Sequence, residues 1–371
     1  MAGIYIHIPF CFSKCSYCDF YSIVGYTKHD KFFDCLFKEI DLRKNEFKYN
    51  IDTIYFGGGT PSFVSIDFIS QILNKIFNDF SISTNCEITL EANPDDLNSN
   101  FLKNLLLSGV NRLSIGVQSF IDEDLIFMDR RHNSKTIFNV LSNCDSLGFN
   151  NISIDFIYGL PWSSIDSFYY NLRQLEKINF THLSAYHLSF EENTPFYNKM
   201  VKGEIVENSE DNSFEQYKLL CSFVSDLDMN HYEISNFARK GFESKHNSSY
   251  WQYKPYLGLG PGAHSYYNNC RFINVTDIYK YVSGDFNQIR EVEFLDIDSK
   301  FNEYIMLSLR TYNGISLDYC KYNFGDYYNY LIKKIDKWNR SGHLIVDNRF
   351  VRCTQESWFI SDSIIKDLFY G

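Results

Sequence analysis

Long apolar runs are absent from this sequence of 371 residues. No stretch approaches the ~18 consecutive apolar residues that a membrane-spanning helix needs, so any membrane contact would be peripheral. Positive charge is also in deficit, because 35 Lys and Arg stand against 46 Asp and Glu, a net charge of −11. An acidic surface of this kind argues against a nucleic-acid partner. A charged-then-apolar leader is lacking before Cys11, so we expect a reducing, cytoplasmic location.

Three cysteines at the spacing C-x3-C-x2-C stand out near the start of the chain: Cys11, Cys15 and Cys18. They directly follow the alternating run 4–8, which predicts a β-strand. A loop that leaves a strand and presents three thiolates within eight residues can hold a small iron–sulfur cluster. Most such clusters have four protein ligands, so three ligands predict one open iron that binds a small molecule. Three incidental cysteines would not account for this spacing at a strand end.

Tyr17 stands directly before the third cysteine, and the whole pattern resembles the signature of radical S-adenosylmethionine (SAM) proteins. The longer string from Tyr5 to Cys11 (YIHIPFC) is similar to the branch that holds the oxygen-independent coproporphyrinogen III oxidases and the HemW-type haem chaperones. The resemblance implies a [4Fe–4S] cluster on the three cysteines, with SAM bound to the open iron through its amino and carboxylate groups. It also implies an electron donor such as a flavodoxin or ferredoxin.

Short apolar segments alternate with helical ones along the first half of the chain. We expect strands at about 3–8, 52–56, 86–91, 111–116, 151–156 and 181–187. Between them lie helices such as the one from Ser65 to Phe80, whose apolar residues recur at helical spacing. One strand followed by one helix, repeated six times, predicts a parallel α/β fold that falls short of a closed eight-stranded barrel. The expected fold class is therefore a partial (βα)6 TIM-like barrel, as the resemblance also implies.

The alternation of strands and helices ends near residue 290, and a different pattern follows. Helices are expected from Phe301 to Arg310 and from Tyr327 to Trp338, followed by a strand near 344–346. This pattern suggests a small winged-helix-like domain, which in an acidic chain is better suited to cover the barrel or dock a partner than to bind nucleic acid. We therefore divide the chain into a barrel with the cluster and SAM site (1–200), an extension that completes the barrel (201–290) and the C-terminal domain (291–371).

Polar residues follow the ends of the expected strands, where parallel barrels collect their chemistry. Glu91, Gln118 and Asp155 lie at three such ends, and a run of three glycines follows the second strand. The glycines allow close backbone approach and would offer unpaired N–H and C=O groups, or they form a plain tight turn. No Gly-Lys-Ser/Thr follows them, which excludes a phosphate loop. By resemblance the SAM-binding residues are Tyr5, Tyr17, Gly58, Gly59, Thr60, Glu91, Gln118, Arg130 and Asp155, with Arg131 as a rival to Arg130.

Two departures separate this chain from the oxidases. Their pattern has a further cysteine two residues after the third ligand, where this chain has Phe20, and they carry an N-terminal extension that is not seen before Tyr5. Both departures favour the haem chaperones. The alternative is an oxygen-independent coproporphyrinogen III oxidase of porphyrin biosynthesis, which decarboxylates propionate side chains oxidatively; a radical SAM enzyme with another substrate is a third option.

A second motif, His246-Asn-Ser-Ser-Tyr250-Trp251, resembles the H-N-x-x-Y-W motif associated with haem binding in HemW-type proteins. An imidazole can bind haem iron, and Tyr and Trp offer flat faces to the macrocycle. Alternatively, His-Asn caps a turn and Tyr-Trp belongs to a buried strand. His264, in a later Gly-rich run, is a further candidate haem ligand. The resemblance thus implies haem and acceptor haemoproteins as partners, with membrane-bound respiratory enzymes as one class of acceptor.

Overall fold

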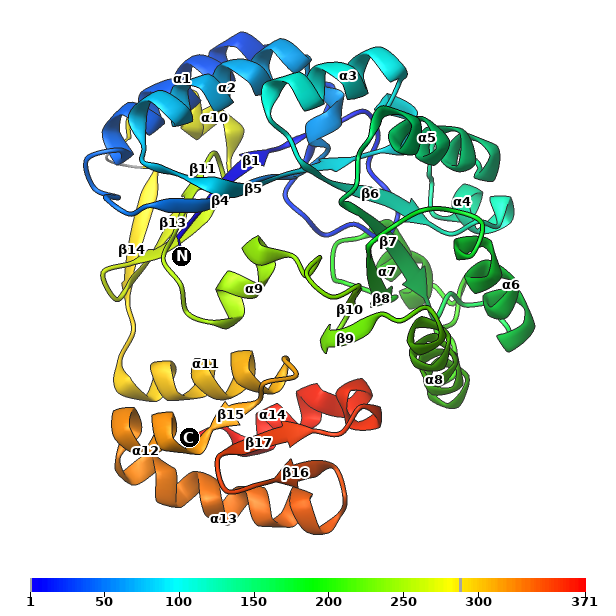
Figure 1. The fold of residues 1–371 in the computed structure, drawn as a ribbon, viewed down its shortest axis with the longest axis vertical. Coiled ribbons are helices and arrows are strands. Elements are labelled where there is room, and N and C mark those ends of the chain that lie inside the picture. Colours follow the sequence, from blue (N-terminus) through cyan, green and yellow to red (C-terminus); the bar gives the residue numbers. More distant parts are fainter. Residues whose placement is uncertain (1, 287–288) are drawn as a thin grey trace.

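The computed structural model describes residues 2–286 and 289–371. Its centre is a 12-stranded sheet in the order β14-β13-β12-β11-β1-β4-β5-β6-β7-β8-β10-β9 (Figure 1). The six central strands are parallel and follow one another along the chain: β1 (Gly3–Ile8), β4 (Ile51–Gly58), β5 (Ile82–Ala92), β6 (Arg112–Gln118), β7 (Ile152–Tyr158) and β8 (His182–His187). They confirm the six predicted strands, although β5 begins earlier than expected.

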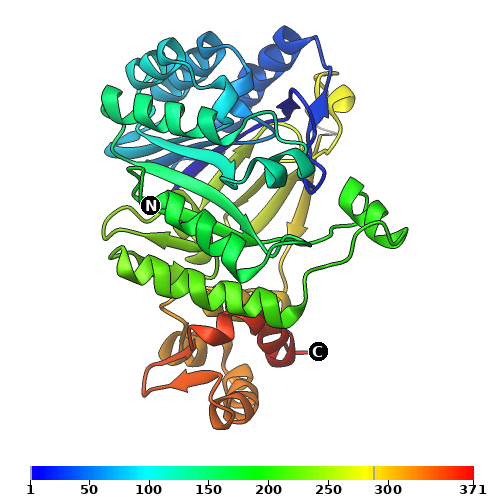
Figure 2. The same ribbon diagram turned by 90° about the vertical axis from the view of Figure 1, so that its right-hand side faces the viewer.

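Helices cover the outer face of this sheet (Figures 1 and 2). They are α1 (His29–Arg43), α2 (Ile66–Asp79), α3 (Ser99–Ser108), α5 (Ser134–Leu147), α6 (Ile165–Leu175) and α8 (Glu210–Asp226). In α2 the hydroxyl of Ser65 accepts a hydrogen bond from the N–H of Asp67, as a helix cap should. Its buried residues Ile69, Ile72, Leu73 and Ile76 share one face. Helical spacing therefore places this face against the sheet.

Side chains of the central strands alternate between an apolar outer face and a polar inner face. Ile4, Ile6 and Ile8 of β1 belong to the buried apolar core. Tyr5 and His7 consequently face the opposite side, the inside of the barrel. The inside is therefore furnished with polar and aromatic groups.

The sheet is extended at both ends but does not close. Beyond β8 lie the antiparallel strands β10 (Asn236–Ala238) and β9 (Asn230–Glu233). Beyond β1 lie β11 (Tyr256–Leu259), β12 (His264–Tyr267), β13 (Cys270–Asn274) and β14 (Arg290–Phe294). The short helix α9 (Lys245–Trp251) lies in the space between these two ends (Figure 1). The result is the expected partial barrel.

Short elements occupy the connections around the barrel. They are β2 (Phe10–Cys11), β3 (Ile23–Val24), α4 (Asp122–Phe127), α7 (Pro195–Val201) and α10 (Ile278–Tyr281). Strand β2 pairs with β3, which fixes both ends of the loop that carries the three cysteines.

The C-terminal part packs below the barrel in the view of Figure 1. It consists of α11 (Ile297–Leu309), β15 (Ile315–Ser316), α12 (Leu317–Phe324), α13 (Asp326–Arg340), β16 (Leu344–Val346), β17 (Phe350–Cys353) and α14 (Ser361–Leu368). The order helix, strand, two helices and hairpin matches the winged-helix-like expectation. Backbone hydrogen bonds attach it to the barrel, from Ile234 to Arg310 (2.9 Å) and from Tyr312 to Tyr232 (3.0 Å).

The residues that the structure describes contain neither a membrane-spanning helix nor a disulfide bond. None of their helices is both long and apolar enough to cross a lipid bilayer. All ten cysteines of the chain lie in the described ranges, and each is free.

Candidate functional site

The three cysteines of the loop after β1 line one cavity. Cys11, Cys15 and Cys18 border a hollow of about 490 Å³ at the carboxyl ends of the parallel strands. The hydroxyl of Thr60 donates to the sulfur of Cys11 at 3.3 Å. Burial raises the pKa of Cys18 to about 11 and also raises that of Cys11. Both groups therefore hold their protons until a metal replaces them.

This donor set fits an iron–sulfur cluster rather than a single ion. Among the described residues, no three His, Cys, Asp or Glu side chains come close enough to share one metal. A cubane cluster spreads its protein ligands over different irons, so three separated sulfurs around one cavity suit it. The remaining wall of the cavity carries polar groups of both signs, which leaves room for a charged small molecule beside the cluster.

The glycine run after β4 holds the root of the cysteine loop. The N–H of Gly59 donates to the carbonyl of Ile8, and the N–H of Thr60 donates to that of Phe10, both at 2.8 Å. The expectation that the glycine run offers unpaired N–H groups is therefore wrong for Gly59. Gly58 has a φ of 112°, and a Cβ there would lie 2.7 Å from the His7 ring. The glycines are needed because strand, loop and turn meet here without space for side chains.

Two carboxylates, on β5 and β7, enter the cavity from either side of β6. Tyr55 donates to Glu91 at 2.8 Å, and Ser114 donates to Asp155 at 3.0 Å. Burial, reinforced by the negative charge of Asp155, raises the pKa of Glu91 to about 7. Burial also raises the pKa of Asp155. Both acids are poised to gain a hydrogen-bonding or cationic ligand, which would favour their charged forms.

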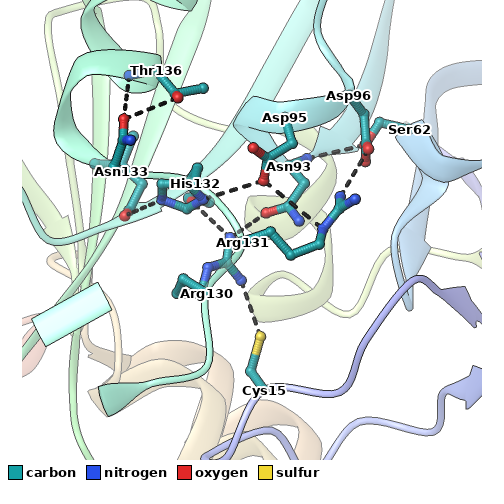
Figure 3. A network of polar contacts seen from close by, with 12 residues as sticks. Cys15, Ser62, Asn93, Asp95, Asp96, Arg130, Arg131, His132, Asn133 and Thr136 are labelled. Atoms are coloured by element: carbon teal, nitrogen blue, oxygen red, sulfur yellow. Dashed lines mark hydrogen bonds and ion pairs between the residues drawn. The ribbon is translucent and has the colours of Figure 1, made fainter. Parts of the chain in front are cut away.

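Arg130 links the cysteine loop to the far wall of the cavity (Figure 3). Its Nη1 lies 3.3 Å from the sulfur of Cys15, and its Nη2 donates to the carbonyl of Gly116 at 2.7 Å and to Asn93. Its Nε is buried and has no partner in the described residues. The guanidinium brings a positive charge to the cavity wall beside the cysteine sulfur, which suits an anionic ligand group.

Arg131 makes its ion pairs away from the cysteine sulfurs. It pairs with Asp96 at 2.8 Å and with Asp95 at 3.8 Å (Figure 3). Its guanidinium also lies 4.7 Å from the ring centre of Phe12. Arg131 thus holds neighbouring loops together, although one edge of it reaches the cavity wall.

Most residues that the sequence suggested for SAM lie around this one cavity. They are Tyr17, Gly58, Gly59, Thr60, Glu91, Gln118, Arg130 and Asp155. Tyr5 is the exception, because it lines a second cavity of about 310 Å³ and its hydroxyl lies 3.1 Å from Nδ1 of His7.

Tyr186 and His187, which sequence reasoning placed at the end of the sixth strand on the same rim, also line the first cavity. Asn93 and Ser114 line it too, and sequence reasoning did not select them. Strand alternation could have found Ser114, since Gly116 and Gln118 share its face of β6.

The second motif folds as α9, and its histidine is buried rather than open. Nδ1 of His246 lies 2.8 Å from the hydroxyl of Thr53, and its Nε2 lies 2.7 Å from that of Tyr250. The ring also stacks on Tyr55, with ring centres 5.0 Å apart. Burial, with a contribution from the positive charge of Arg112, lowers the pKa of His246 to about 3. His246 as haem ligand stays a prediction, but in this structure both of its nitrogens are already engaged.

The other residues suggested for haem binding do not all line the same cavity. Tyr250 and His264 both line the second cavity, together with residues of β1 and of the cysteine loop. Trp251 lines neither cavity, and its buried indole N–H has no partner among the described residues. Of the two residues that line the second cavity, Tyr250 is half-buried and His264 is exposed.

Comparisons with known proteins identify the family of the chain. Residues 5–175 match the model of the radical SAM superfamily. A protein of Bacillus subtilis (strain 168) named "Heme chaperone HemW" is 34% identical over 322 residues, covering 85% of each chain. The protein of that name from Buchnera aphidicola subsp. Schizaphis graminum is 31% identical and covers 98% of this chain and 97% of its own.

A solved structure shows the same fold. Coproporphyrinogen III oxidase (HemN) from Escherichia coli superimposes with a TM-score of 0.85 at 23% identity, covering 99% of this chain and 90% of that one. Identity at that level supports the architecture and not the activity. The relatives that exceed 30% identity over most of both chains decide the family: the chain belongs to the HemW family of the radical SAM superfamily.

Proposed function

We propose that this chain binds haem and passes it to acceptor haemoproteins. One observation carries the preference over porphyrinogen oxidation. Phe20, which stands where the oxidase pattern has a further cysteine, is 66% exposed and borders both cavities. An exposed apolar ring in that place offers a packing face instead of a reactive thiol.

Cys11, Cys15 and Cys18 would hold a [4Fe–4S] cluster. When bound, such a cluster can pass one electron to the sulfonium of SAM. The residues around it do the positioning: Thr60 donates to the sulfur of Cys11, and Arg130 brings a positive charge to that of Cys15. Hydrogen bonds and charges at the sulfurs stabilise their anionic form. A flavodoxin or ferredoxin is the electron donor that suits this proposal.

SAM would occupy the rest of the first cavity. Carboxylates accept from ribose hydroxyls and attract ammonium groups, and an arginine binds a carboxylate. Glu91 and Asp155 would therefore bind the ribose and amino ends of SAM, while Arg130 would face its carboxylate. Tyr17 and Gln118 line the same space and would enclose the ligand.

Haem would bind where flat aromatic side chains gather at the open side of the barrel. Tyr250 belongs to that group and packs edge to face on Tyr256, with ring centres 4.6 Å apart. Aromatic faces of this kind suit a planar macrocycle. A protein that carries haem between other proteins would work in the cytoplasm, and its acceptors would include membrane-bound respiratory enzymes reached from that side.

An anaerobic haem titration of the cluster-reconstituted chain tests this proposal. We expect a saturable Soret band, followed by its transfer to an added apo-haemoprotein. The control is the same titration with an unrelated protein of similar size and acidity, because haem adheres to many apolar surfaces. A band that never saturates, together with turnover of coproporphyrinogen III, would contradict the proposal in favour of the oxidase.

A further inference from the structure

The second cavity lies on the inner face of β1, β11 and β12, where the cysteine loop passes over them. Its wall is mostly aromatic: Tyr5, Phe20, Tyr21, Tyr250, Tyr256 and His264. At about 310 Å³ it falls at the lower end of small-molecule cavities, so a ligand larger than this would keep one edge in solvent. Such a cleft suits a flat ring that enters edgewise between aromatic faces.

Three imidazoles lie in or beside this cavity, and two of them are already in use. His7 donates from Nε2 to the carbonyl of Tyr21 at 2.9 Å, because a carbonyl can only accept. Its Nδ1 consequently accepts from Tyr5 at 3.1 Å. His246 is held at both nitrogens by Thr53 and Tyr250. To bind an iron, either ring would have to give up the hydrogen bond at the nitrogen that binds, and leaving its buried partner unpaired would be costly.

The third imidazole, that of His264, is free. It is exposed at the start of β12, and it makes no hydrogen bond with any described residue. Burial of part of the ring and the nearby charge of Arg271 lower its pKa, which keeps it in the neutral form that binds metals.

The backbone of the hairpin holds this histidine in place. A Cβ on Gly258 would lie 1.9 Å from the carbonyl oxygen of His264, so only glycine permits the close packing of β11 on β12. The buried hydroxyl of Ser265 accepts from the N–H of Gly258 at 2.9 Å. Because successive side chains of a strand alternate, Ser265 turned into the core leaves His264 directed to the other side, toward the cavity.

We propose that the second cavity is the haem site and that His264, not His246, is the axial ligand of the haem iron. The proposal rests on the haem-binding function proposed above and names its site. The step is the formation of one coordinate bond: the lone pair of an imidazole nitrogen binds the iron and displaces a weakly held water. No electron or proton is transferred. His246 instead acts as a positioning residue, which holds Tyr250 in the wall of the cavity through its Nε2.

The test compares three histidine variants of the full chain, reconstituted with its cluster and titrated with haem under anaerobic conditions. His264→Ala should abolish the spectrum of imidazole-ligated haem and weaken haem binding by roughly tenfold or more. Added free imidazole should restore the spectrum, which shows that the fold and the cavity are intact. His343→Ala, which removes a half-buried imidazole outside both cavities, is the control and should leave the spectrum unchanged.

His246→Ala separates the two candidate ligands. We expect it to retain the spectrum of imidazole-ligated haem. Loss of that spectrum in His246→Ala with its retention in His264→Ala would overturn this assignment while leaving the haem-binding function in place. Failure of the unaltered chain to bind haem saturably would overturn the proposed function itself, so the two failures are distinguishable.

Discussion

The loop after β1 and the helix α9 both carry short motifs, but the structure gives them opposite settings. The loop presents its three cysteines to a cavity at the carboxyl ends of the strands. Helix α9 turns His246 into the barrel, where Thr53 and Tyr250 take both ring nitrogens. The sulfurs of the first motif thus line a cavity, whereas the histidine of the second motif is buried and hydrogen-bonded. A motif names residue types, but only the packing around it decides which atoms remain free to bind.

Removing one cysteine from the loop should have the largest effect and tests whether these thiolates bind a cluster. Cys15→Ser should abolish the iron–sulfur absorbance and the bound iron, because two thiolates do not hold a cubane cluster. Cys270→Ser, a half-buried cysteine of β13 outside both cavities, is the matched control and should retain both signals. A full cluster in Cys15→Ser, measured by iron content and absorbance, would refute the ligand assignment.

A structural role for His246 predicts a large loss of stability. His246→Ala removes a buried ring and leaves the hydroxyls of Thr53 and Tyr250 without their partner. We expect the free energy of unfolding to fall by about 2–4 kcal/mol, measured by urea denaturation. His264→Ala, which removes an exposed ring without hydrogen bonds, should change it by less than about 0.5 kcal/mol. Equal costs for the two variants would contradict the contrast between them.

The glycine run tests how tightly the cysteine loop is held. A Cβ on Gly59 would lie 2.8 Å from the carbonyl carbon of Pro9 and from the carbonyl oxygen of Phe10. Gly59→Ala should therefore displace the root of the loop, cost about 1–3 kcal/mol and lower the yield of reconstituted cluster. Gly148→Ala is the control, because that position has a φ of 85° but open space around it. An unchanged cluster yield in Gly59→Ala would show that the loop tolerates movement at its root.

Sequence patterns predicted the barrel and its rim because both depend on local rules. Strands at regular intervals and polar residues at their ends are enough to place Glu91, Gln118 and Asp155 around one cavity. The fate of His246 depends on contacts between α9 and strands far away in the sequence, and no local pattern encodes them. Tyr5 shows the same limit: its place on β1 was predictable, but the cavity that it faces depends on where α9 packs.

The two cavities should also respond differently to pH, which gives the smallest of these effects. With a pKa of about 7 for Glu91, its ionised fraction falls from about nine-tenths at pH 8 to about one-tenth at pH 6. Tyr55, Asp155 and Arg112 act on the same carboxyl, but burial is the largest cause of the shift. If the carboxylate binds SAM, the affinity for SAM should fall by up to about tenfold over this range. Haem binding by the neutral His264 should change little, because its pKa is already lowered.

Matched glutamines identify the group responsible for this pH dependence. Calorimetric titration of Glu91→Gln with SAM should show a flat pH profile between 6 and 8. Glu233 is the control, because burial raises its pKa to about 7 as well but it lines neither cavity. Both raised values lower the free energy of unfolding as pH increases from about 4 to 7, since the unfolded chain releases these protons first. Both acids should therefore lower stability as pH rises. Only Glu91 should also make the affinity for SAM depend on pH. A pH profile that flattens in Glu233→Gln and persists in Glu91→Gln would remove Glu91 from the SAM site.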